Sequence, residues 1–293
     1  MTETQAGSTV PRRQLGRYLR ELRLATGLSV RAAAKELERS EPTMWRVESG
    51  QVSMRAIEVE GMCRLYGASE DMTKALIALA RETKAKGWWQ AYGDVLSESL
   101  DLYVGLEAAA ARIDWYESEL APGLFQTPEY ARALVLAHVP DEVEAKVNRR
   151  VQLRMERQAI LRRPIDPPVL RVLLRESILR CPVGGPAVMS GQLGRLAEAC
   201  GLPNVALRVV PFAAGLQPGM LSGSFEILRF PVNGSGLESE PPTVYADRFT
   251  GALYLDKPHE VERYDQSFGV MWDAALDEAA SKVEILRAVE ELR

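Results

Sequence analysis

Residues 27–50 read GLSVRAAAKELERSEPTMWRVESG and contain two short segments that each follow a serine. The hydroxyls of Ser29 and Ser40 can accept hydrogen bonds from free backbone N–H groups at a helix start, which predicts helices over residues 30–37 and 40–49. Only Glu38 and Arg39 connect them. Two short helices joined by a tight turn form a helix-turn-helix. Such pairs also occur in all-helical proteins that bind no nucleic acid, so both interpretations are open on this pattern alone.

The apolar residues of this stretch predict how the two helices pack. Ala33, Ala34 and Leu37 form a narrow stripe of mostly small side chains, which lets a second helix cross closely. Met44 and Val47 supply the inward face of that second helix. A small helical core is therefore expected.

The residues after the second helix extend this core. Gly50 stands where the helix needs a left-handed cap. A further helix over 54–66 is expected to close the core with Ile57, Met62 and Leu65. A fifth helix, capped by Ser69, is expected to run to residue 85 and complete the unit.

The outward face of the second helix is polar and its surroundings are basic. The face consists of Glu41, Pro42, Thr43 and Arg46. Few acidic residues offset the arginines around the motif, which are Arg17, Arg20, Arg23, Arg31, Arg39, Arg46 and Arg55. A basic surface beside a polar helix face favours nucleic-acid binding.

Residues 15–51, LGRYLRELRLATGLSVRAAAKELERSEPTMWRVESGQ, resemble the Cro/repressor-type (XRE) helix-turn-helix family. The resemblance implies a DNA-binding domain in which Glu48 reaches back to the first helix and braces the fold, without touching DNA. Two positions depart from the family. Glu38 stands where the family usually has glycine, and Val30 stands where it usually has glutamine, so one phosphate contact is expected to be missing.

Length and charge predict a two-part chain. Its 293 residues are too many for one small domain, and 46% of them are hydrophobic, which is enough for a sizeable core. Residues 1–86 carry 15 Lys and Arg against 11 Asp and Glu, a net charge of +4, whereas the remainder carries 21 against 29, a net charge of −8. A basic head on an acidic body fits a DNA-binding domain attached to a part that does not bind DNA. We expect a disordered lead over 1–11, a helix-turn-helix domain over 12–86 and a regulatory domain over 87–293, with the boundary at residues 84–87.

The pattern of the larger part changes from helical to strand-like along the chain. Residues 100–163 are predicted to be helical, 168–256 to contain a sheet, and 258–293 to form C-terminal helices. Within the helical part, one helix is expected over 100–120, one from Pro128 through His138 and one over 141–163. Strands are predicted at 169–174, 205–210, 224–230, 243–247 and 252–255, the last three as an antiparallel run. Ser281 and Glu284 can form a capping box for the last helix. The fold class is thus a mainly α N-terminal domain of five helices, followed by an α+β domain whose mixed or antiparallel sheet is covered by helices.

The larger part also resembles a known family. Four segments resemble the C-terminal domain of WhiJ-like actinobacterial regulators: YESELAPGLFQTPEYARAL at 116–134, VLRVLLRESILRCPVGGP at 169–186, LRVVPFAAG at 207–215 and YLDKPHEVERYDQSF at 254–268. The resemblance implies a transcriptional regulator, commonly of development or secondary metabolism. Such regulators are often accompanied by a small partner protein thought to bind this domain.

The chain lacks the motifs of the common catalytic and metal sites. It contains no GxGxxG, GxxxxGK[ST] or GxSxG motif, and its two histidines, His138 and His259, lie near no cysteine. The three cysteines are widely spaced without a CxxC pair, which favours buried thiols over disulfides or a metal site. Three glutamates, Glu107, Glu117 and Glu119, can be interpreted either as an acid–base set across a cleft or as surface charge. We expect no metal, no cofactor and no enzymatic activity.

One loop of the C-terminal part is a candidate binding segment, and the sequence shows no signal for a membrane or for export. Residues 215–223 form a glycine-containing loop that either closes over a small molecule or partner protein, through Gly215, Gln217, Gly219 and Gly223, or simply connects two strands. The sequence contains no run of about 18 apolar residues, so no membrane span is predicted. The N-terminus has no apolar signal core. A cytoplasmic, nucleoid-associated protein is therefore expected.

Together these features predict a sequence-specific transcriptional regulator that binds double-stranded DNA as a homodimer. The helix over 40–49 would enter the major groove, with Arg46 contacting guanine and Glu41, Pro42 and Thr43 as further base contacts. Expected phosphate contacts are Arg31, Ser40, Gln51, Ser53 and Arg55. A small companion protein or small-molecule effector would act on the C-terminal domain. The alternative is a protein-interaction module that mainly binds a small partner protein and binds DNA weakly or only with that partner.

Overall fold

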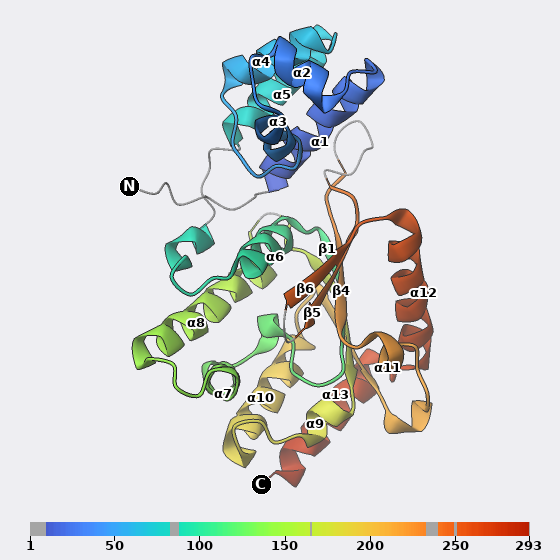
Figure 1. The fold of residues 1–293 in the computed structure, drawn as a ribbon. Coiled ribbons are helices and arrows are strands. Elements are labelled where there is room, and N and C mark those ends of the chain that lie inside the picture. Colours follow the sequence, from blue (N-terminus) through green and yellow to red (C-terminus); the bar gives the residue numbers. More distant parts are fainter. Residues whose placement is uncertain (1–9, 83–87, 165, 233–239, 249–250, 293) are drawn as a thin grey trace. The chain divides into compact units, whose positions relative to one another are not determined.

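The computed structural model describes residues 10–82, 88–164, 166–232, 240–248 and 251–292 (Figure 1). The chain divides into two compact units, residues 1–109 and residues 110–293. The predicted boundary at 84–87 and most of the predicted lead lie outside the described residues. The first helix begins at Val10, so Val10 and Pro11 belong to it and not to the lead.

The N-terminal unit contains the five helices that the sequence predicts. They are α1 (Val10–Ala25), α2 (Val30–Glu36), α3 (Glu41–Glu48), α4 (Ala56–Leu65) and α5 (Glu70–Glu82), followed by a 3-10 turn η1 (Trp88–Tyr92) and α6 (Glu98–Ala109). The predicted serine caps are confirmed. Ser29 Oγ accepts from the backbone N–H of Ala32 at 3.1 Å, and Ser40 Oγ accepts from that of Thr43 at 3.3 Å.

Glycine ends α3 with the predicted left-handed cap. Gly50 has φ +71°, and the backbone N–H of Gln51 donates to the carbonyl oxygen of Arg46 at 2.8 Å. A Cβ atom at position 50 would also lie 2.6 Å from the Cα atom of Arg13. The glycine is therefore required both by the backbone conformation and by the close approach of α1.

The turn after α2 uses the same geometry without glycine. Glu38 has φ +51°, and the backbone N–H of Arg39 donates to the carbonyl oxygen of Ala34 at 2.8 Å. The left-handed conformation places the Cβ of an L-residue close to the backbone, which costs about 1 kcal/mol. The tight turn thus forms despite the departure at Glu38 from the usual glycine.

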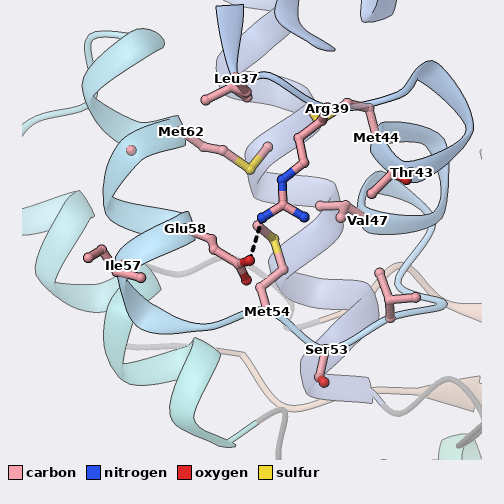
Figure 2. Close-up of a pocket in the computed structure, with 12 residues that line it drawn as sticks. Leu37, Arg39, Thr43, Met44, Val47, Ser53, Met54, Ile57, Glu58 and Met62 are labelled. Atoms are coloured by element: carbon pink, nitrogen blue, oxygen red, sulfur yellow. Dashed lines mark hydrogen bonds and ion pairs between the residues drawn. The ribbon is translucent and has the colours of Figure 1, made fainter.

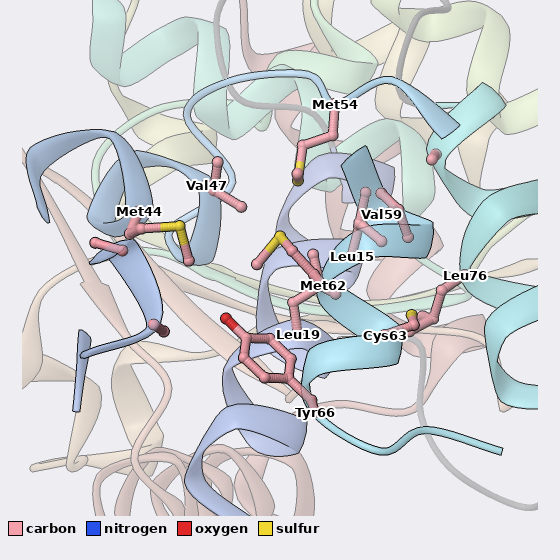
Figure 3. Packing of buried hydrophobic residues seen from close by; sticks show 13 residues of the cluster. Leu15, Leu19, Met44, Val47, Met54, Val59, Met62, Cys63, Tyr66 and Leu76 are labelled. Carbon is pink, nitrogen blue, oxygen red and sulfur yellow. The ribbon is translucent and has the colours of Figure 1, made fainter. Parts of the chain in front are cut away.

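The core of the N-terminal unit is formed by all five helices, α1 to α5, and the predicted stripe on α2 contributes Ala33 and Ala34 to it (Figure 3). Met44, Val47 and Met62 are buried as predicted. Ile57 is not part of this core, because 74% of its surface is exposed. The inward face of α4 consists of Val59, Met62 and Cys63, which are three and four residues apart and therefore lie on one side of the helix. Ile57 lies on another side.

The C-terminal unit is an α+β fold built on one mixed sheet. Its strands are β1 (Arg112–Glu117), β2 (Val169–Arg175), β3 (Val205–Val210), β4 (Phe225–Arg229), β5 (Thr243–Arg248) and β6 (Gly251–Leu255). The order across the sheet is β3-β2-β1-β4-β5-β6. The first three strands are mutually parallel, and β4, β5 and β6 form the predicted antiparallel run.

Helices cover both faces of this sheet (Figure 1). They are η2 (Gly123–Phe125), α7 (Pro128–His138), α8 (Glu144–Arg157), η3 (Gln158–Arg162), α9 (Ser177–Arg180), α10 (Pro186–Ala199), η4 (Phe212–Ala214), α11 (Gly219–Ser222), α12 (Pro258–Ala274) and α13 (Glu278–Glu291). Val261, Phe268 and Met271 of α12 pack in one cluster with residues of β1, β2, β4 and β5. In Figure 1, α12 lies on one side of the sheet, and α7 and α8 lie on the other.

The prediction of a continuous helix over 100–120 is wrong. The helix ends at Ala109, and β1 follows from Arg112 to Glu117 as a central strand between β2 and β4. Its residues Ile113, Asp114, Trp115 and Tyr116 are all buried. A strand covered on both faces carries no alternation between apolar and polar residues, so its apolar positions were consistent with a helical period.

Two predicted helix boundaries also differ. Ser281 does not cap the last helix, because Asp277 holds that position and accepts from the backbone N–H of Ala280 at 2.7 Å. Ser281 is buried, and its hydroxyl accepts instead from the backbone N–H of Val209 on β3 at 2.9 Å. The helix predicted over 141–163 begins at Glu144 and ends at Arg157, after which the chain forms η3.

The cysteines and helices give two further results. All three cysteines are free: Cys63 is buried, but Cys181 is exposed and Cys200 is half-buried, so the expectation of buried thiols holds fully only for Cys63. Among the residues that the structure describes, no helix is long and apolar enough to cross a bilayer.

We expect Glu38→Gly to stabilise the N-terminal unit by about 1 kcal/mol, since glycine adopts a positive φ without strain. The measurement is the free energy of unfolding from chemical denaturation, with hydrogen exchange of amides in α2 and α3 as the signal that reports on this unit. Lys35→Gly, about one turn earlier and inside α2, is the control and should destabilise the unit by about 1 kcal/mol. Equal effects of the two substitutions would show that the turn is not strained.

Candidate nucleic-acid interface

A buried ion pair fixes α3 against α1. Arg23 on α1 donates from Nε to Glu48 Oε1 at 2.6 Å and from Nη2 to Glu48 Oε2 at 2.9 Å. Its Nη1 donates to the carbonyl oxygen of Leu28, just before α2, at 2.6 Å. Only 6% of either side chain is exposed, and the hydrogen bonds to Glu48 raise the pKa of Arg23 above its usual value. The brace from Glu48 to the first helix, which the family resemblance implies, is confirmed, and one guanidinium joins α1, α3 and the residue before the cap of α2.

The helix held in this way presents four of its side chains outward. Glu41 and Pro42 are exposed, whereas Thr43 and Arg46 are half-buried. The Arg46 Nη2 group lies 3.4 Å from Thr43 Oγ1, and its buried Nε has no hydrogen-bond acceptor among the described residues. The guanidinium therefore lies along the helix next to Thr43. The structure brings the predicted base contacts together on one helix.

Trp45 is an outward residue that the sequence analysis missed. It lies on α3 between Met44 and Arg46, and 58% of its surface is exposed. It follows Pro42 by three positions and Glu41 by four, which places it on the same side of the helix. The signal was present in the spacing, but an aromatic residue beside a buried methionine is more easily interpreted as core.

The predicted phosphate contacts lie at the edges of α3. Gln51, Ser53 and Arg55 are exposed in and after the connection that follows α3. Arg31 on α2 is exposed and lies 3.6 Å from the carboxylate of Glu41. Ser40 is exposed, but its hydroxyl already caps α3 and lies 2.8 Å from the Thr43 hydroxyl.

The basic surroundings are more balanced than the sequence suggested. The expectation that few acidic residues offset the arginines is wrong, because charge partners exist for four of them: Arg23 with Glu48, Arg31 with Glu41, and Arg39 and Arg55 with Glu58. The partners are distant in sequence in most cases, so only the folded chain brings them together. The net charge of the head remains positive.

Glu58 at the start of α4 connects two arginines. Its carboxylate accepts from the backbone N–H of Arg55 at 2.8 Å, from the Arg55 guanidinium at 3.3 Å and from the Arg39 guanidinium. Burial raises the pKa of Glu58, but these hydrogen bonds and the charge of Arg39 together lower it below its ordinary value. The ionised carboxylate thus fixes the start of α4 and the turn between α2 and α3.

The loop at 215–223 of the C-terminal unit is partly structured. Gly219 begins α11 and is buried, and a Cβ atom there would lie 2.4 Å from atoms of Tyr116 and Met271. Gln217 is also buried and donates from Nε2 to the carbonyl oxygen of Ala214 at 2.7 Å. Gly215 and Gly223 adopt positive φ values at its two ends. The loop's role in binding a ligand or partner remains a prediction.

The three glutamates have different surroundings. Glu107 lies in the N-terminal unit, is buried and accepts from the Tyr103 hydroxyl at 2.8 Å, so it is not a surface charge. In the C-terminal unit, burial raises the pKa of Glu117 to about 7, and its carboxylate accepts from Trp115 Nε1 at 3.0 Å. Glu119 is exposed. No group of three His, Cys, Asp or Glu side chains in the described part of the chain has a geometry suited to a metal ion.

Comparison with known families matches both parts of the chain. A family described as "Helix-turn-helix domain" matches residues 14–76, which extend from α1 into α5. A family described as "Domain of unknown function (DUF5753)" matches residues 100–287, more than half of the chain. Comparison with curated proteins and with solved structures gave no match.

We expect Glu48→Ala to destabilise the N-terminal unit by about 3 kcal/mol, because it leaves the Arg23 guanidinium buried without its charge partner. The measurement is native-state hydrogen exchange of amides in α1 and α3. Lys74→Ala is the control, because it removes only the exposed ion pair with Glu70 on α5. It should change the free energy of opening of the same amides by less than about 0.5 kcal/mol. A small effect of Glu48→Ala would mean that α3 is held by apolar packing alone.

We expect the stabilising effect of Glu58 to disappear in acid. A carboxylate whose folded pKa is lowered stabilises the fold above its unfolded pKa, and this stabilisation is lost as the pH falls through the folded pKa. Glu58→Gln should therefore lower the melting temperature of the N-terminal unit at pH 7, with a difference that closes as the pH falls below the ordinary value of 4.5. Glu60→Gln, at an exposed pair with Arg64, is the control. A difference independent of pH would refute the ionic role.

Proposed function

The chain belongs to the DUF5753 family and carries a helix-turn-helix domain before that domain, and on this premise we propose that it is a sequence-specific transcriptional regulator. It reads the major groove of double-stranded DNA through α3, as a homodimer, and its C-terminal unit controls this binding. The observation that carries the proposal is the arrangement of α3. The buried Arg23–Glu48 pair holds the helix on one side, and an exposed Trp45 and a half-buried Arg46 lie on the other.

Base recognition is assigned to the outward side chains of α3. The N-terminal residues of a recognition helix reach base edges, which suits Glu41, Pro42 and Thr43 at the start of α3. Arg46 lies in the last turn of α3, and its long side chain ends in a guanidinium that can donate two hydrogen bonds to guanine O6 and N7. Glu41 can accept from the amino group of cytosine, and Thr43 can contact a base directly. Pro42 and Trp45 offer apolar surface to the methyl group of thymine.

Phosphate contacts set the register of the complex. Arg31, Ser40, Gln51, Ser53 and Arg55 are all exposed near the ends of α3, which supports their assignment to the DNA backbone. The charge distribution supports one orientation, because residues 1–86 carry a net charge of +4 and the rest a net charge of −8. Phosphate attracts the first part and repels the second.

We propose a homodimer because a single helix-turn-helix module is expected to have a small interface with DNA. One helix-turn-helix module buries little surface on DNA, and such modules commonly bind as dimers on half-sites about one helical turn apart. We therefore propose an inverted-repeat operator and a location at the nucleoid. The proposed activity is binding, without a catalytic step.

Control through the C-terminal unit is supported by exposed apolar side chains. Phe212, Leu216, Met220 and Leu221 lie in or next to the 215–223 loop, and between 42% and 85% of each is exposed. Exposed apolar clusters commonly mark contact surfaces for other proteins. This observation fits the companion protein that the resemblance to WhiJ-like regulators implies. It also supports the second candidate function, a protein-interaction module with weak or partner-dependent DNA binding.

The proposal is tested by selection from a random duplex library with the purified chain at near-physiological salt. Enrichment of an inverted repeat would support a dimeric, sequence-reading regulator. A chain that selects no sequence alone, but does so after addition of a cell extract, would support the partner-dependent candidate. A chain that selects no sequence under either condition would contradict the proposal.

We expect Arg46→Ala to weaken binding to the selected operator by about 1–3 kcal/mol and to relax one base position, since it removes a bidentate base contact. Arg55→Ala is the matched control, because a lost phosphate contact weakens binding to all sequences alike and lowers the salt dependence by about one ion. Competition assays with operator and random duplexes at several salt concentrations separate the two effects. Uniform weakening by Arg46→Ala would mean that Arg46 contacts phosphate only.

A further inference from the structure

The N-terminal unit contains a cavity of about 340 Å³ between α3, the connection that follows it and α4 (Figure 2). Most of its lining is apolar: Met44 and Val47 come from α3, Met54 from the connection, and Ile57 and Met62 from α4. The volume lies within the range of small-molecule sites, roughly 300–1,000 Å³. Three methionines in one lining give an adaptable apolar surface.

Two features of α4 along this cavity have no structural explanation in the unit itself. Gly61 lies in the interior of the helix, where glycine costs about 1 kcal/mol relative to alanine. A Cβ atom there would have no neighbour within 4 Å, so neither packing nor a positive φ requires glycine. Ile57, one turn earlier, leaves 74% of its surface exposed. An occupant of the cavity would cover Ile57 and would explain the absence of a side chain at Gly61.

The charges of the lining indicate the chemistry of the occupant. The Arg39 side chain is paired with Glu58, as Figure 2 shows, and Arg55 beside the cavity lies 3.3 Å from the same carboxylate. Two guanidinium groups thus share one carboxylate, which leaves one positive charge in excess. Both guanidinium groups are partly exposed, so they can donate hydrogen bonds to a second anion. Thr43 and Ser53 add hydroxyl groups to the lining.

We propose that this α3–α4 cavity binds a small apolar carboxylic acid. Its apolar part lies against Met44, Met54 and Met62 and covers Ile57, and its carboxylate pairs with Arg39. An amine of the same shape is disfavoured by the excess positive charge, and a neutral alcohol lacks the ion pair. This inference concerns binding to the N-terminal unit, and it holds whether or not the chain binds DNA.

The test is a titration of the full chain with 4-phenylbutyrate, 4-phenylbutanol and 4-phenylbutylamine, followed by NMR of ¹³C-methyl methionine. The nine methionine signals are assigned by single Met→Leu substitutions. We expect saturable shifts of Met44, Met54 and Met62 and unchanged signals from the other methionines. Binding should be at least several-fold tighter for the carboxylate than for the alcohol, and weakest for the amine. Equal affinities for the three probes, or no shifts at these methionines, would overturn the proposal.

Two substitutions localise the site. Gly61→Leu fills the cavity and should weaken 4-phenylbutyrate binding at least tenfold, whereas Gly61→Ala, the control, adds one methyl group and should retain most of the binding. Arg39→Gln should remove the preference for the carboxylate over the alcohol while the alcohol still binds. Unchanged binding in Gly61→Leu, or an unchanged preference in Arg39→Gln, would contradict the assignment. The Arg39 comparison keeps the test decisive if the leucine variant does not fold.

Discussion

The N-terminal unit depends on one buried ion pair. Arg23 donates one hydrogen bond from each of its three guanidinium nitrogens, two to Glu48 and one to the carbonyl oxygen of Leu28, so a single side chain joins α1, α3 and the residue before the capped start of α2. A buried charge without a partner is costly, and the pair therefore tolerates few alternative positions of α3. The side of the helix that carries Pro42, Trp45 and Arg46 is oriented as a consequence.

The turns around this pair are just as constrained. Gly50 lets α1 approach the end of α3 closely, and its positive φ returns the chain toward the connection that precedes α4. Glu38 performs the same turn after α2 with a side chain, at a cost in strain. Glu58 then joins Arg39 from that turn to Arg55 at the start of α4. Helix starts and ends of this unit are thus linked by charged groups at its surface, and the apolar core beneath them retains the α3–α4 cavity.

The helix-turn-helix was predictable because its signals are local. The caps at Ser29 and Ser40 involve hydrogen bonds over three residues, and the glycine at position 50 follows from the conformation of a helix end. The candidate base contacts could be found for the same reason, since residues on one helix share a face by spacing alone. Trp45 shows the limit of this approach: its spacing from Glu41 and Pro42 indicates the outward side, but an aromatic side chain is also typical of a core, and its exposure depends on which neighbours cover it.

The amino-acid sequence by itself determined the two-part organisation, the five N-terminal helices, most of the strands and the antiparallel run at the end of the sheet. These features arise from caps, turns and periodicity within a few residues. Only the tertiary structure decided that β1 is a central strand, that Ser281 binds β3 rather than capping a helix, and that Ile57 lies outside the core. It also decided which acidic residues pair with the arginines. Each of these outcomes depends on partners distant in the chain, and burial or pairing with such partners outweighs the weak local preferences of a short segment.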